Sequence, residues 1–111
     1  MKASAAELLQ RLPGPVSEKW YGGEPFAAAF AHGSMSVEIY APVGSDTQGP
    51  HTQDELYFIH AGSGTFLSAT REYSFAPGDC LFVPAGVEHR FTRFTSDFAA
   101  WVVFYGPEGG E

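Results

Sequence analysis

The chain has 111 residues, which allows one domain and not two of ordinary size. Thirteen acidic against six basic residues give a formal net charge of −7, which argues against a nucleic-acid partner because no basic patch could neutralise phosphates. The single cysteine excludes an internal disulfide, and the chain carries neither a signal-peptide pattern nor an apolar run of membrane-spanning length. We therefore expect a cytoplasmic protein with no membrane partner.

A short helix is expected near the N-terminus. Ser4 and Glu7 have the spacing of a capping box, and leucines follow on one stripe, so the pattern predicts a helix over residues 4–12. The sequence Pro-Gly-Pro then ends the helix. Residues 13–25 are expected to form an extended lead-in.

The remainder of the chain has the pattern of an all-β domain. Segment 25–32 is ambiguous, since its alanines favour a helix while its phenylalanines and short length allow a strand. Segment 35–41 alternates clearly between apolar and polar residues, and residues 101–105 are apolar on both faces, as in a strand covered on both sides. Short strands separated by Gly and Pro turns predict an antiparallel barrel or sandwich over 26–105, followed by a loose tail over 106–111.

Two strand segments carry the candidate chemistry. Because side chains alternate between the faces of a strand, one face of the segment after Gly49 carries His51, Gln53, Glu55 and Tyr57. One face of a later segment carries His89, Phe91 and Arg93. If both faces line one barrel interior, His51, Glu55 and His89 meet, and two imidazoles with one carboxylate form a divalent transition-metal site with open positions. The alternative is that His51 and Glu55 only hydrogen-bond to each other inside a polar barrel mouth.

The spacing of these residues resembles the two sequence motifs of the cupin superfamily. Glu55, followed after six residues by Gly62, matches the end of the first motif. Gly78, a Pro-Ala-Gly turn after five residues, and His89 after two more match the second motif without a gap. Counting back from Glu55 places His51 at the second histidine of the first motif.

The sequence departs from the motifs at two positions. The first histidine position falls on Gly49, which has no side chain to bind a metal, and the final asparagine position falls on Arg93. The resemblance implies an all-β fold, a cupin-type double-stranded β-helix (jelly-roll) barrel with a short N-terminal helix, over one domain spanning residues 1–111. It also implies that His51, Glu55 and His89 are the ligands of a divalent metal such as Fe, Mn, Zn or Ni.

The functions implied by the resemblance fall into two classes. The first is a metal-dependent enzyme of dioxygenase, isomerase or lyase type that acts on a small acidic metabolite, with Glu55 and Arg93 as catalytic residues. The alternative is a non-catalytic metabolite-binding or sensor cupin with a vestigial metal site, which the missing histidine at Gly49 favours.

The roles of several other residues can be interpreted in two ways. Gln53 is a weak metal ligand or a polar lining residue of the cavity, and Tyr57 and Phe91 are expected in the cavity wall. Arg93 either points inward, to bind a carboxylate or phosphate, or lies at the rim, paired with Glu88 or Asp97.

The remaining expectations concern packing and assembly. Glu38 and Tyr40 share a face and either line the cavity or are exposed, while His60 lies on the face opposite Glu55 and is not expected to be a ligand. Cys80 is expected to be a buried small hydrophobe. Because only 17% of the residues are charged, we also expect a homodimer.

Overall fold

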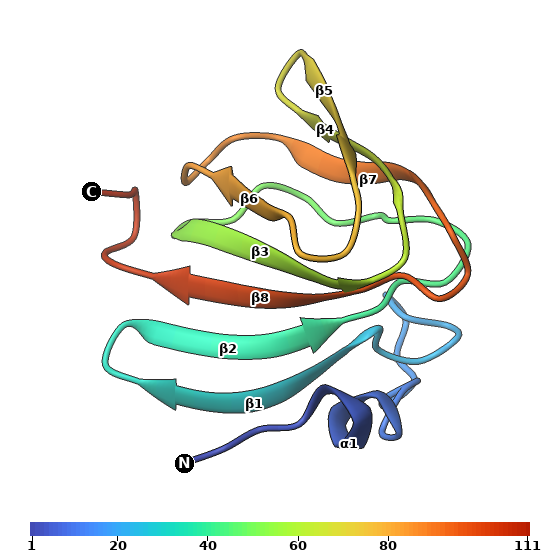
Figure 1. The fold of residues 1–111 in the computed structure, drawn as a ribbon. Coiled ribbons are helices and arrows are strands. Elements are labelled where there is room, and N and C mark those ends of the chain that lie inside the picture. Colours follow the sequence, from blue (N-terminus) through green and yellow to red (C-terminus); the bar gives the residue numbers. More distant parts are fainter.

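The computed structural model describes residues 1–111 as one helix and eight strands (Figure 1). In chain order the elements are α1 (Ala5–Leu9), β1 (Phe26–His32), β2 (Met35–Tyr40), β3 (Asp54–Ala61), β4 (Gly64–Ser68), β5 (Arg71–Phe75), β6 (Cys80–Val83), β7 (His89–Phe94) and β8 (Ala99–Tyr105). The predicted all-β fold with a short N-terminal helix is thus confirmed. The ambiguous segment 25–32 forms the edge strand β1.

The strands form two antiparallel sheets. The larger has the order β1-β2-β8-β3-β6, and the smaller has the order β5-β4-β7 (Figure 1). β8 lies between β2 and β3, with Ala100 and Val102 buried on its inner face, whereas Trp101 and Val103 on its apolar outer face are partly exposed. β3 and β7 belong to different sheets, so residues from the two predicted motifs reach the interior from opposite sides.

The space between the sheets is filled mainly by aromatic rings. Phe91 is 1% exposed, and its ring centroid lies 4.7 Å from that of Phe66 and 4.5 Å from that of Phe98. Burial of this apolar surface is the main stabilising contribution to the fold. Phe91, predicted to be in the cavity wall, therefore lies in the hydrophobic core instead.

Helix α1 is shorter than predicted. The α-helical hydrogen bonds give way to a tighter turn, in which Arg11 N donates to the Leu8 carbonyl and Leu12 N donates to the Leu9 carbonyl. The Ser4 side chain makes no capping hydrogen bond, so the predicted capping box does not form. Leu8 is buried where the helix contacts β1 and β2, and no helix of the structure is long and apolar enough to cross a membrane.

The C-terminal residues 106–111, predicted to be loose, are hydrogen-bonded to the start of β3. Gly109 N donates to the Thr52 carbonyl (2.6 Å), and Glu111 N donates to Asp54 Oδ2 (3.3 Å). Asp54 is 8% exposed, and its other oxygen accepts a hydrogen bond from Ala85 N (2.9 Å). One carboxylate thus connects the tail, β3 and the turn before β7.

Candidate metal centre

Three side chains from different parts of the chain converge at one end of the space between the sheets. His51 precedes β3, Glu55 lies within β3, and His89 is the first residue of β7. His89 Nε2 lies 3.0 Å from Glu55 Oε1, and His51 Nε2 lies 3.8 Å from Glu55 Oε2. One candidate ligand atom from each residue lies within 4.8 Å of the other two, so the three could hold one metal ion.

A backbone hydrogen bond connects the segments that carry the two histidines. Gly86 N donates to the His51 carbonyl at 2.8 Å. Gly86 has a φ of +79°, a left-handed conformation that glycine adopts without steric cost. The turn before β7 therefore fixes the position of His51 as well as that of His89.

The buried atoms of this cluster lack ordinary hydrogen-bond partners. Glu55 is 1% exposed, and neither of its oxygens has a well-aligned hydrogen bond, nor does His89 Nε2. His89 Nδ1 donates to the Val87 carbonyl (2.8 Å), so in the neutral ring the Nε2 lone pair faces Glu55. Two lone-pair atoms at 3.0 Å require a cation between them, either a proton or a metal ion.

The donor set fits a divalent transition metal. Nitrogen and carboxylate ligands lie about 2.0–2.2 Å from such an ion, so two ligands of one ion stand at most about 4.4 Å apart. Both separations from Glu55, 3.0 and 3.8 Å, satisfy this limit. The three ligand atoms lie within 4.8 Å of one another, so a side-chain shift of at most about 0.4 Å would bring every pair within it. Imidazole with carboxylate suits Fe, Zn and Ni, and does not by itself select one of them.

The two histidines differ in proton affinity. Burial lowers the pKa of His51, and the charge of Glu55 offsets this only in part. Burial also acts to lower the pKa of His89, but the hydrogen-bonding and charge contributions of Glu55 and the Val87 carbonyl outweigh it and raise the pKa. Of the two histidines, His89 therefore binds a proton more tightly, because its ring contacts Glu55.

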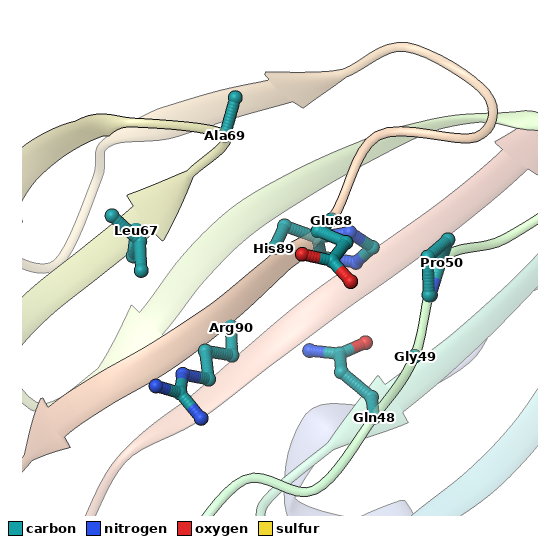
Figure 2. A pocket seen from close by; sticks show the side chains of 8 residues that line it. All are labelled: Gln48, Gly49, Pro50, Leu67, Ala69, Glu88, His89 and Arg90. Carbon is teal, nitrogen blue, oxygen red and sulfur yellow. The ribbon is translucent and has the colours of Figure 1, made fainter.

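The cluster opens into a cavity of about 410 Å³, within the usual range for small-molecule sites. Among the residues that line it are His51, Glu55, Tyr57, Glu38, Tyr40, Gln48, Lys19, Trp20 and Phe104. Phe104 packs edge-on against His51, with ring centroids 4.9 Å apart. A smaller hollow of about 260 Å³, lined by His89, Gln48 and Pro50 among others, lies beside it (Figure 2).

Some predicted site residues line this cavity and others do not. Tyr57 lines the cavity as expected. Glu38 and Tyr40, predicted either to line the cavity or to be exposed, also line it. Gln53 lies elsewhere, because its amide nitrogen donates to the carbonyls of Ser34 (2.8 Å) and Gly106 (2.9 Å).

Arg93 is exposed on β7 and does not reach the cavity. Thr65 pairs with Arg93 whereas Phe66 pairs with Phe91, so Thr92 is an extra residue in the β7 ladder. This bulge reverses the alternation after Phe91 and turns Arg93 outward. No ion pair connects Arg93 to an acidic residue, and Lys19 is the cationic residue in the cavity wall.

Three cavity residues were missed by the sequence analysis: Lys19, Trp20 and Gln48. Lys19 and Trp20 lie in the lead-in, which carries no strand pattern, and Gln48 lies in the loop between β2 and β3. The alternation of side chains between two faces applies only within strands, so it gives no information on these positions.

The cavity also contains a carboxyl group that titrates near neutrality. Burial, followed by the charges of Glu55 and Glu24, raises the pKa of Glu38 from 4.5 to about 7. A folded-state pKa above the unfolded one means that the stabilising contribution is complete below pH 4.5 and is lost as the pH rises through 7. The other titratable groups lining this cavity, besides Glu55, are Lys19, Tyr40, His51 and Tyr57.

We therefore expect Glu38→Gln to reduce the pH dependence of stability. Between pH 4.5 and 8 the unfolding free energy of the wild type should fall by about 2 kcal/mol more than that of the variant. One pKa unit is worth about 1.4 kcal/mol, and partial exposure of Glu38 screens part of its charge. Urea unfolding of both chelator-treated proteins at several pH values measures the difference. If the unfolding free energies of the two proteins changed with pH in the same way, the raised pKa of Glu38 would be contradicted.

The comparisons with known proteins agree with this fold. The cupin domain family matches residues 36–105, which include His51, Glu55 and His89. An uncharacterized protein of Streptomyces coelicolor is 40% identical over 77 residues, covering 68% of this chain and 73% of that protein. The chain therefore belongs to the cupin domain family.

Solved structures show the same fold at low sequence identity. A cupin-2 domain protein of Rhodospirillum rubrum has a TM-score of 0.62 and 17% identity, over 75% of this chain and 60% of that one. A cupin 2 conserved barrel domain protein of Salinispora arenicola has a TM-score of 0.62 and 16% identity, over 73% and 74% of the two chains. The chain thus has the jelly-roll barrel fold of the cupins, and spans about three fifths of the Rhodospirillum protein.

Proposed function

We propose that this protein binds one divalent transition metal through His51, Glu55 and His89 and is a metal-dependent enzyme for a small acidic metabolite. The observation that carries the proposal is the buried Glu55 carboxylate, whose oxygens have no well-aligned hydrogen bond and lie 3.0 and 3.8 Å from two imidazole nitrogens. A buried carboxylate costs free energy unless a cation compensates it. Three protein ligands also leave coordination positions free for a substrate.

The residues around the cluster support catalysis more than storage. When bound, the divalent ion would polarise an oxygen atom of the substrate as a Lewis acid. Lys19 replaces Arg93 as the group that would hold an anionic carboxylate or phosphate, with Trp20 beside it in the cavity wall. Glu38, with a pKa of about 7, would accept or return a proton, as dioxygenase-, isomerase- and lyase-type reactions require.

Elemental analysis of the purified protein tests the metal site. We expect about one equivalent of metal in the wild type and a large loss in His51→Ala, which removes one of three ligands. His60→Ala is the matched control, because His60 is an exposed histidine close to the site in sequence, on the same strand as Glu55. Equal metal content in all three proteins would contradict the ligand assignment.

A non-catalytic metabolite-binding or sensor protein is the second candidate. It is favoured by Gly49, which is exposed and offers no side chain at the position where the resemblance places a ligand. The two functions differ in turnover. If the metal-loaded protein binds small carboxylates in the cavity, yet converts none of a panel of hydroxy and keto acids, the second candidate is supported.

We also propose that the protein forms a homodimer through an outer apolar face of the larger sheet. This face comprises Leu56, Phe58, Cys80, Phe82 and Trp101, which are adjacent in the strand pairing. Phe58 is 42% and Phe82 53% exposed, and Cys80 is exposed rather than buried as predicted. Exposed contiguous aromatic groups of this kind are unfavourable in a monomer.

Phe82→Glu is expected to convert the dimer into a monomer of 12.0 kDa, because a charge would be buried in the contact. Light scattering after size-exclusion chromatography measures the mass. Tyr73→Glu is the control, since Tyr73 is 41% exposed but lies on β5 of the smaller sheet. A wild type that is monomeric at micromolar concentration would exclude this assembly.

A further inference from the structure

A side-chain oxygen of the loop between β2 and β3 lies next to the candidate ligands. Gln48 Oε1 is 3.0 Å from His51 Nε2 and 3.1 Å from the Tyr57 hydroxyl, and both Gln48 and Glu55 line the same cavity. Two ligands in adjacent octahedral positions at about 2.1 Å from one ion stand about 3.0 Å apart. The Gln48 oxygen is thus at ligand spacing from His51.

The orientation of the Gln48 amide is fixed by a buried carboxylate. Gln48 Nε2 donates to Asp46 Oδ2 at 2.7 Å, and Asp46 is 6% exposed. An ionised carboxylate only accepts hydrogen bonds, so the amide nitrogen must face Asp46 and the oxygen must face the histidines. Figure 2 shows the Gln48 side chain pointing from its loop toward His89 on β7.

Asp46 itself is held in place by three further donors. Its oxygens accept hydrogen bonds from the Tyr40 hydroxyl (2.6 Å), Phe91 N (2.8 Å) and Gln48 N (3.1 Å). Because Phe91 N belongs to β7, the network anchors the loop to the strand that carries His89. Gln48 is therefore a preorganised group rather than a mobile loop side chain.

Binding of an ion changes what the Gln48 oxygen can contact. Without metal, Oε1 accepts hydrogen bonds from His51 Nε2 and the Tyr57 hydroxyl. When His51 Nε2 gives its lone pair to an ion it carries no proton, so the hydrogen bond from His51 is lost. The amide oxygen then has a free lone pair beside the His51 nitrogen that would hold the ion.

We propose that Gln48 is a fourth metal ligand, contributing its amide oxygen beside His51, Glu55 and His89, with Asp46 as its positioning residue. This inference rests on the proposed metal-binding function. It completes a set of two nitrogen and two oxygen donors, and it supplies from position 48 the ligand that Gly49 lacks. An added hard oxygen donor favours ions such as Mn²⁺ and Fe²⁺ relative to a site of nitrogen ligands alone.

Titration of the chelator-treated protein with CoCl₂ tests the assignment, since the visible absorption of Co²⁺ reports on its ligands. Relative to the wild type, Gln48→Ala and Gln48→Met should bind Co²⁺ about 10- to 100-fold more weakly and with an altered visible spectrum. Gln48→Met keeps the side-chain volume while removing the oxygen. Gln53→Ala is the matched control, because the Gln53 amide nitrogen donates to the carbonyls of Ser34 and Gly106. Its loss should leave the Co²⁺ affinity and the visible spectrum unchanged.

The outcomes separate this inference from the function on which it rests. If the wild type binds Co²⁺ and the two Gln48 variants match it in affinity and spectrum, Gln48 is only a hydrogen-bond partner of His51. If the wild type binds no Co²⁺, the proposed metal site itself fails. Thermal unfolding of the metal-free variants, compared with the wild type, verifies that weaker binding does not arise from loss of the fold.

Discussion

Replacing His89 with alanine is expected to lower the unfolding free energy of the metal-free protein by about 3 kcal/mol at pH 8. His89 and Glu55 form a buried pair with 3.0 Å between Nε2 and Oε1, and both side chains are at most 1% exposed. Removing the imidazole leaves the Glu55 carboxylate buried without its nearest polar partner. Chemical denaturation monitored by tryptophan fluorescence measures the loss.

A double variant distinguishes the loss of the pair from the loss of packing. Adding Glu55→Gln to His89→Ala removes the uncompensated charge, so much of the lost stability should return, even though the imidazole volume is still missing. If the single and double variants are equally unstable, the cost arises from the empty volume and not from the charge. Such a result would also weaken the case for a cation between the two residues.

The same pair shows why the site opposes stability when no metal is bound. A buried ion pair contributes little net free energy, because desolvation offsets the attraction between its charges. An ion that binds only the folded state adds stability in proportion to the logarithm of its concentration above Kd. We interpret the Glu55 oxygens, which lack a well-aligned hydrogen bond, as a local cost that the fold tolerates because a ligand can offset it.

How much of this site could be read from the sequence depended on where its residues lie. Glu55 and His89 were predictable from both strand alternation and motif spacing, whereas His51 lies before β3 and was predictable from motif spacing alone. The prediction of an inward Arg93 required an unbroken β7, and the extra residue at Thr92 reversed the alternation. The bulge coincides with a close approach at Gly64, where a Cβ atom would lie 1.9 Å from the Arg93 carbonyl oxygen.

Long-range contacts account for the other differences. The role of Gln48 depends on Asp46, and Asp46 is placed by Phe91 N, 45 residues further along the chain. No local pattern in the loop between β2 and β3 predicts such a contact. Likewise, Cys80 was expected to be buried on apolarity alone, but it lies on the outward face of edge strand β6. Composition indicates how much apolar surface exists and not which face is covered.

The second large effect is expected at Asp46. Asp46→Ala should lower the unfolding free energy by about 3–5 kcal/mol, because hydrogen bonds to a charged group are worth about 1.5–3 kcal/mol each and the buried donors are left unsatisfied. Four donors lose their acceptor: the Tyr40 hydroxyl, Phe91 N, Gln48 N and the Gln48 amide. Asp97→Ala is the matched control, since Asp97 is exposed and accepts only from the Thr95 hydroxyl, and it should cost less than about 1 kcal/mol.

Asp46→Asn separates the role of the charge from the role of shape. An asparagine amide keeps one accepting oxygen but presents an NH₂ group to donors that require an acceptor. We therefore expect Asp46→Asn to lose less unfolding free energy than Asp46→Ala and more than Asp97→Ala. The same substitution frees the Gln48 amide to turn, because its nitrogen no longer faces an obligatory acceptor. Equal stability of Asp46→Ala and Asp97→Ala would mean that Asp46 does not anchor the loop, and the orientation assigned to the Gln48 oxygen would then lose its physical basis.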